Sequence, residues 1–181
     1  MAEAARLADE SGFDRLTLAA VAQRFGVAVP SLYKHISGLD ALRRQVALRG
    51  IRELGDALAA AVAGDGALTE IAHAYRGYAR SHPGRYSATL RAPDPDDANT
   101  TTATQPVLDT VLGVMAGYGL TGADAIDATR ALRAALHGFV ELEAVGGFGL
   151  PQDVDRSFER LIEILDTAFS NWTPEARSFL L

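Results

Sequence analysis

A short apolar stripe that is closed by a glycine is the feature that most constrains how this chain folds. The stripe consists of Leu18, Val21, Ala22 and Phe25. These residues recur at helical spacing, so they place one apolar face on a helix that begins at Thr17, a suitable N-cap. Gly26 interrupts the period where a left-handed residue would end the helix. A helix this short must bury its apolar face against a neighbour to be stable.

A second short helix is expected to supply that neighbour. It starts near Pro30, whose fixed φ suits a first helical turn, and Val27 fills the angle between the two helices. Leu32 and Ile36 face the core. The outward set comprises Val29, Pro30, Ser31, Tyr33, Lys34 and His35. This pattern is that of a helix-turn-helix, whose second helix enters the major groove of DNA.

The stretch GVAVPSLYKHISGLDAL resembles the recognition helix and the following helix of tetracycline-repressor-like (TetR family) transcription regulators. The matching positions are Gly26, Val27, Leu32, Tyr33, His35 and Leu42. A second stretch, from Leu136 to Gly149, is similar to the Trp-His-Gly segment of one subgroup, with Leu136 in the position of the Trp. The resemblance implies an all-α fold with a DNA-binding domain at 1–45 and a ligand-binding and dimerisation domain at 46–181.

The distribution of charge agrees with DNA as the partner, although the whole chain carries −6. Residues 1–52 hold eight basic and five acidic side chains, a net +3, whereas residues 53–181 carry −9. The positive charge therefore lies where the motif lies. Because this field is modest, we expect specific binding to need two copies of the motif, as in a homodimer on a palindromic operator.

The outward side chains predict how DNA is contacted. The predicted DNA-binding residues are Thr17, Val29, Pro30, Ser31, Tyr33, Lys34 and His35. Tyr33, Lys34 and His35 can donate to phosphates, and Ser31 can reach a phosphate or a base edge. Apolar contact with thymine methyl groups suits the leading Val29 and its neighbour. The recognition helix offers no Arg, Asn or Gln, so part of the specificity is expected from DNA shape or from water.

The rest of the chain reads as helices, without the alternation that a half-buried strand requires. Ser37 is predicted to cap a long helix over 39–63, in which Gly50 and Gly55 indicate close packing of another backbone or a kink. Further helices are expected at 2–11, 68–81, 86–90, 107–118, 123–145 and 153–172. The stretch 92–106, rich in Pro, Asp and Thr, is interpreted as a mobile loop or a shortened entrance to a helix.

The last two helices predict a dimer interface. The final helix carries a broad apolar stripe, and the helix before it offers small residues that let another helix approach. The predicted interface residues are Ala134, Gly138, Glu141, Phe158, Leu161, Ile162, Leu165 and Phe169. Two such helices from each copy would form a four-helix bundle, and the alternative is that the stripe packs only within one chain.

A small-molecule site is expected among polar groups on otherwise apolar helices. The candidates are His73, Tyr75, Tyr78, Tyr86, Met115, Tyr118 and His137. Each of them could instead be a core or surface residue without a ligand. A ligand bound there would favour an arrangement, transmitted by helix 39–63, in which the two recognition helices no longer fit successive grooves.

Other functions find less support. The sequence contains no cysteine, no phosphate-binding glycine loop and no nucleophile elbow, and His137 and Glu141 alone do not make a metal site. We therefore expect no catalytic residues, no cofactor and no metal. Without a signal peptide or a long apolar run, we expect a cytoplasmic protein that does not bind membranes. The alternatives are a ligand-binding or interaction protein without DNA binding and, with least support, an all-α enzyme.

Overall fold

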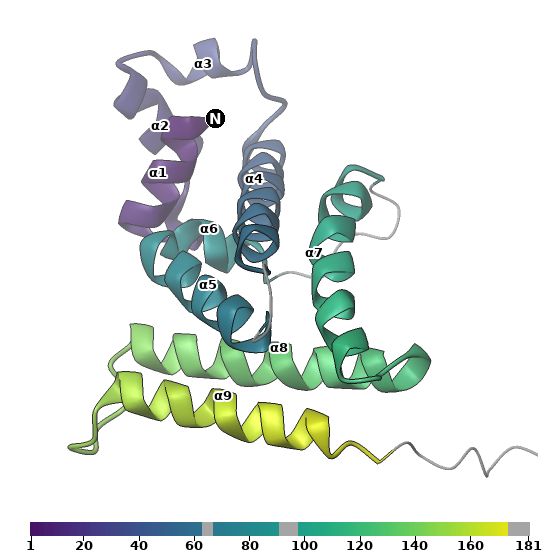
Figure 1. The fold of residues 1–181 in the computed structure, drawn as a ribbon. Helices are drawn as coiled ribbons and strands as arrows, with labels where there is room; N and C mark the ends of the chain where they lie inside the picture. The colour runs from purple at the N-terminus through teal and green to yellow at the C-terminus, as the bar shows by residue number, and fades with distance from the viewer. Residues whose placement is uncertain (63–66, 91–97, 174–181) are drawn as a thin grey trace, which may run out of the picture.

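The computed structural model describes residues 1–62, 67–90 and 98–173 of the chain. Within these ranges the regular structure is helical and contains no strand, which confirms the predicted all-α class (Figure 1). The elements are α1 (Ala2–Ser11), the 3₁₀ turn η1 (Phe13–Arg15), α2 (Leu18–Phe25), α3 (Val29–Leu32), α4 (Leu39–Ala61), α5 (Ala67–Ser81), α6 (Pro83–Ala88), α7 (Ala98–Gly117), α8 (Gly122–Ala144) and α9 (Val154–Ser170). Of the helices described, none is long and apolar enough to cross a membrane.

The first helices enclose a small core of their own. Its buried members are Ala4, Ala8, Phe13, Leu16, Val21, Leu42, Val46 and Ala88. α2 begins and ends as predicted, because the Thr17 hydroxyl accepts the Ala20 N–H at 3.1 Å and Gly26 is left-handed, with φ 66°. The Val27 N–H then donates to the Ala22 carbonyl at 3.0 Å, which closes the helix end and sets the direction of α3.

Three details of this motif differ from the prediction. α3 ends at Leu32, and residues 33–35 are turns that follow it. Phe25 and Val27 are 50% and 43% exposed instead of packed, because Phe13 and Leu16 already fill the core beside α2.

The prediction that Ser37 caps α4 is also wrong. Gly38, and not Ser37, occupies the N-cap position of α4, and no side chain caps this end. The backbone there has φ 132°, which only glycine adopts readily, so the capping role falls to the residue that can make the bend.

α4 joins the small core to the larger one (Figure 1). Leu42 and Val46 face the first core, while Leu54 and Leu58 face the second. Val62, which fell within the predicted helix 39–63, lies just beyond the observed helix end and is 37% exposed.

The two glycines of α4 mark close packing, which confirms one of their two interpretations. A Cβ at Gly50 would lie 2.7 Å from the main-chain oxygen of Arg85 on α6. One at Gly55 would lie 3.0 Å from a methyl group of Val107 on α7. The missing side chains therefore let α6 and α7 approach α4.

α6 begins earlier than the sequence suggests. Pro83 and Gly84, expected to separate two helices, instead form the first turn of α6, with Pro83 at a position that needs no N–H. The helix ends at Ala88, two residues before the predicted end at residue 90.

For residues 98–106, α7 overturns the first interpretation of 92–106, a mobile loop, and agrees with the second, an entrance to a helix. Residues 98–106 belong to this helix, and 92–97 lie outside the described residues. Pro106 cannot donate the hydrogen bond that a helix interior needs, but its side chain is exposed, and Ala103 and Val107 pack inward on either side of it. Contacts between α4 and α7 thus stabilise a helix whose local sequence disfavours one.

α8 and α9 lie side by side beneath the other helices and run antiparallel (Figure 1). Their ends lie within two residues of the predicted ones. Arg76 of α5 reaches both, with hydrogen bonds of 2.8 and 2.5 Å to Glu143 and 2.6 Å to Asp155, and its guanidinium covers the ring of Phe158.

Candidate functional site

The surface around α3 carries the residues predicted to contact DNA. The exposed ones are Thr17, Pro30, Ser31, Tyr33, Lys34 and His35, and Val29 is half-buried. Tyr33 is 58% exposed, so its ring is available to a partner. Thr17 uses its oxygen to cap α2 and keeps its hydroxyl proton free to donate to a phosphate.

Only part of the nearby basic charge is available to a partner. Arg6 and Arg24 form ion pairs with glutamates of α1. Arg43 donates to main-chain oxygens at 2.8 and 3.3 Å. Lys34 and Arg44 are exposed and have no acidic partner in the part of the chain that the structure describes. Arg44 was not among the predicted DNA-binding residues. Two adjacent arginines look alike in the sequence, which does not show that Arg43 is occupied by main-chain oxygens and that Arg44 has no acidic partner among the described residues.

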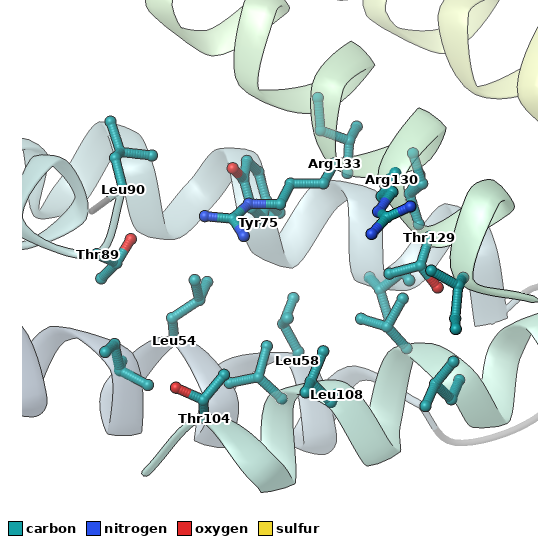
Figure 2. A pocket seen from close by; sticks show the side chains of 18 residues that line it. Leu54, Leu58, Tyr75, Thr89, Leu90, Thr104, Leu108, Thr129, Arg130 and Arg133 are labelled. Carbon is teal, nitrogen blue, oxygen red and sulfur yellow. The ribbon is translucent and has the colours of Figure 1, made fainter. Parts of the chain in front are cut away.

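A cavity of ≈ 550 Å³ lies between α4, α5, α7 and α8, with the end of α6 at its edge (Figure 2). Its apolar lining includes Leu54 and Leu58 of α4 and Leu108 of α7. Its polar lining consists of Tyr75, Thr89, Thr104, Thr129, Arg130 and Arg133. A mostly apolar cavity of this size with a few polar groups is the usual form of a small-molecule site.

Three of the predicted ligand residues are brought together at this cavity. Tyr75 lines it, and its hydroxyl lies 2.9 Å from that of Tyr86. The Tyr86 hydroxyl lies 2.7 Å from Nδ1 of His137. Burial raises the pKa of both tyrosines, so the phenols are neutral near pH 7 and the three side chains form a hydrogen-bonded chain behind the wall.

The other four candidates lie elsewhere. Tyr78 donates to the main-chain oxygen of Gly50 at 3.1 Å, and Met115 is fully buried in the core. Tyr118 donates to Asp166 at 2.5 Å. His73 packs edge-on against a ring of α9 on the far side of α5. None of these four lines the cavity, because each side chain serves the packing between helices.

The polar residues that sequence reasoning missed come from two helices. Thr129, Arg130 and Arg133 project from α8, where only the small residues had drawn attention. Thr104 lies in the segment 92–106, which was interpreted as a mobile loop or a shortened entrance to a helix. The i, i+3 spacing of the two arginines was the signal that could have indicated a shared face.

α6 connects the edge of the cavity to α1, α2, α3 and the start of α4, which carry the residues predicted to contact DNA and are called the DNA-binding unit below. Arg85 donates to the Asp9 carboxylate of α1 from both its main-chain N–H, at 2.9 Å, and its Nε, at 2.8 Å. It also donates to Glu53 of α4 at 2.5 Å. At Gly84 a Cβ would lie 2.0 Å from the main-chain oxygen of Ala8, so α1 and α6 touch backbone to backbone. Movement of α6 must therefore move α1 or break these contacts.

The residues predicted for the dimer interface divide into two groups. Phe158, Ile162, Leu165 and Phe169 are at most 9% exposed within the single chain, so their side chains build its core and cannot reach a partner. Ala134 and Glu141 are exposed, and Gly138 and Leu161 are half-buried. The outer face of α8 and α9 also carries Leu142 at 49% and Ile164 at 64% exposure. The apolar side chains of α9 therefore pack mainly within the chain.

Among the described residues, no three or more His, Cys, Asp or Glu side chains are grouped so that they could hold a metal ion. His137, considered with Glu141 at the sequence level, is instead held by Tyr86.

An exposed helix-turn-helix on a helical body with its own cavity is the arrangement expected of a DNA-binding transcriptional regulator. Residues 1–46 match the family described as "Bacterial regulatory proteins, tetR family", and residues 68–165 match "Tetracyclin repressor-like, C-terminal domain". The chain belongs to the TetR family of transcriptional regulators, which is a family of DNA-binding proteins and not of enzymes.

Known relatives agree with this assignment. The chain is 44% identical over 142 residues to Rv0681 of Mycobacterium tuberculosis, an uncharacterised HTH-type transcriptional regulator; the match covers 76% of this chain and 65% of that protein. It is 38% identical over 154 residues to the uncharacterised HTH-type regulator YobS of Bacillus subtilis, covering 83% and 80%. A TetR variant from Acinetobacter baumannii AYE, solved in complex with minocycline, shares the fold, with a TM-score of 0.67 and 21% identity over 93% of this chain and 92% of that one.

Proposed function

We propose that this regulator is a homodimeric repressor that releases its operator when a small molecule occupies the cavity between α4, α5, α7 and α8. The observation that carries the proposal is the position of α6. Thr89 and Leu90, directly after this helix, line the cavity. Arg85, within the helix, forms hydrogen bonds to carboxylates of α1 and α4. α6 and the two residues that follow it thus connect the proposed effector site with the DNA-binding unit.

The mechanism is a shift between two arrangements of the dimer. The two recognition helices must lie about 34–36 Å apart to enter successive major grooves. A ligand that displaces α6 would move α1 and the start of α4, and thereby change this separation. The ligand shifts the equilibrium only by as much as it binds the released arrangement more tightly than the DNA-bound one.

The dimer is proposed to form through the outer face of α8 and α9. Ala131, Ala134, Gly138 and Leu142 follow one another at helical spacing on the outer side of α8, and Leu161 and Ile164 do so on α9. Small residues on one helix and exposed apolar ones on the other suit a four-helix bundle across a two-fold axis.

DNA contact is proposed to combine phosphate anchoring with apolar readout. Lys34 and Arg44 supply the free charges, and the exposed hydroxyls of Thr17, Ser31 and Tyr33 supply further phosphate donors. Without Arg, Asn or Gln on α3, we expect shape and water to carry part of the specificity.

The first test selects an operator from random DNA duplexes and then screens small molecules for release of that operator, read by fluorescence anisotropy. We expect the selection to return a palindrome. We also expect the effector to fail to release Leu108→Trp from the operator, because Leu108 lines the cavity and the larger ring takes up space that the ligand needs. Leu108 is 40% exposed, so the substitution should not disturb the core. Ala59→Trp, at an exposed position of α4 that does not line the cavity, is the control. Release that persists in Leu108→Trp would place the effector elsewhere.

A further inference from the structure

We infer that the ligand of this cavity is an amphipathic organic acid, with an extended apolar body and a carboxylate head group. The inference rests on the proposed function in taking the cavity as the effector site, and it adds the chemical class of the effector. It is carried by the unequal chemistry of the two walls that face each other in Figure 2.

One wall is cationic. Arg130 and Arg133 lie one turn apart on α8, and Figure 2 shows the Arg133 side chain reaching toward Tyr75 and the Arg130 side chain beside Thr129. No acidic residue lines the cavity in the described part of the chain. Arg130 has only a loose contact with Asp127, at 3.4 Å and with both side chains mostly exposed, and Arg133 has no ion pair within the described ranges. Arg133, which has no carboxylate partner among the described residues, and Arg130, whose one partner is solvent-exposed, therefore present guanidinium groups that can bind an anion.

Two neutral groups on the same side add hydrogen-bonding capacity. Oγ1 of Thr129 is buried and has no hydrogen-bond partner among the described residues, which is costly unless a ligand supplies one. The Tyr75 hydroxyl is hydrogen-bonded to the Tyr86 hydroxyl, which is in turn hydrogen-bonded to Nδ1 of His137. If Nδ1 of His137 carries the proton and donates, Tyr86 donates to Tyr75, and the proton of Tyr75 is left for a ligand that accepts.

The opposite wall is apolar. Leucine, isoleucine and valine side chains of α4 and α7 line it, and Thr104 is its polar member among the described residues. An alkyl chain or fused ring that fills the cavity would be removed from water along its length, while its head group meets the arginines. A neutral apolar ligand would gain nothing from the two guanidinium groups, which would stay hydrated, and a cationic ligand would be repelled by them.

The test is calorimetric titration of the purified protein with three probes of equal chain length, each below its micellar concentration: dodecanoate, dodecanol and dodecyltrimethylammonium. We expect dodecanoate to bind about tenfold to a hundredfold more tightly than dodecanol, as expected for hydrogen bonds to charged groups. Arg130→Gln with Arg133→Gln should remove this preference and leave the affinity for dodecanol unchanged. Both arginines are exposed, so the double variant should fold. Arg52→Gln, which removes an exposed cation of α4 that does not line the cavity, should retain the preference.

The outcomes separate this inference from the proposed function. Equal affinity for the acid and the alcohol, preference for the ammonium probe, or no binding of any probe would overturn the carboxylate class, while the operator screen could still find a different effector. Preference for dodecanoate that depends on the arginines, without any release of the selected operator, would support the class and contradict the role as an effector site.

Discussion

At Gly50 the main chains of α4 and α6 approach more closely than any side chain would allow. A Cβ would lie 2.7 Å from the Arg85 oxygen and 3.1 Å from a methyl group of Thr89. The Tyr78 hydroxyl also donates to the Gly50 carbonyl, so the same point is fixed from α5. This contact holds the helix that connects the cavity with the DNA-binding unit.

Gly50→Ala is therefore expected to lower the free energy of unfolding by about 1–3 kcal/mol, because the added methyl group forces α4 and α6 apart. Gly77→Ala is the matched control: Gly77 is exposed within α5 and nothing lies within 4 Å of its added Cβ. It should stabilise by about 0.5–1 kcal/mol through helix propensity alone. Urea unfolding measures both, and equal effects would show that the contact at Gly50 is loose.

At the scale of elements, Arg76 fastens three helices together. It projects from α5, binds Glu143 near the end of α8 and Asp155 in the first turn of α9, and lies over the ring of Phe158 at 4.6 Å from its centroid. Hydrogen bonding to Arg76 lowers the pKa of Glu143 below its ordinary value of 4.5, although burial acts in the opposite direction. The ionised carboxylate is thus part of the α5–α8–α9 junction.

The sign of the pH dependence follows from that lowered pKa. The stabilisation by Glu143 is fully present above about pH 4.5 and is lost as the pH falls through the lower pKa of the folded state. Glu143→Gln should cost about 1.5–3 kcal/mol at pH 7, with the difference from wild type shrinking as the pH is lowered to 3. Urea unfolding at pH 7, 5 and 3 measures this, with Glu70→Gln, an exposed change on α5, as the control. A difference that does not vary with pH would mean that the carboxylate is not what Arg76 needs.

At the scale of the whole molecule, the proposed dimer depends on the outer face of α8 and α9. Leu142 and Ile164 are exposed there, whereas Phe158 and Leu165 are buried beneath it. Changes to the buried pair would damage the fold itself, so they cannot test association.

Leu142→Glu with Ile164→Glu is expected to give a folded monomer that binds operator DNA at least tenfold more weakly, because charges would be buried without partners in the interface. Ala60→Glu, at an exposed position of α4, should leave the assembly unchanged. Sedimentation velocity measures the mass of each variant and circular dichroism its helix content. A double variant that remains dimeric would place the interface on another face.

Much of the local structure could be predicted from sequence. The α2 boundaries follow from Thr17 and Gly26, whose roles depend on hydrogen bonds and backbone angles within a few residues. The course of α7 could not, because a proline in a polar stretch disfavours a helix locally and only packing on α4 overrides it. The cavity was predicted in part: Tyr75 was found as a polar residue on an apolar helix, but the arginines that face it come from α8.

The sequence by itself determined the helical class, the helix-turn-helix and its exposed residues, because each depends on period, caps and the polarity of single positions. Only the tertiary structure decided which side chains share a space. It put Phe158 and Phe169 into the core, brought Arg130 and Arg133 over an apolar wall, and joined Arg85 to Asp9, 76 positions earlier in the chain. The physical reason is that burial and charge pairing are properties of contacts between helices, and such contacts leave little signal in the spacing of residues along one helix.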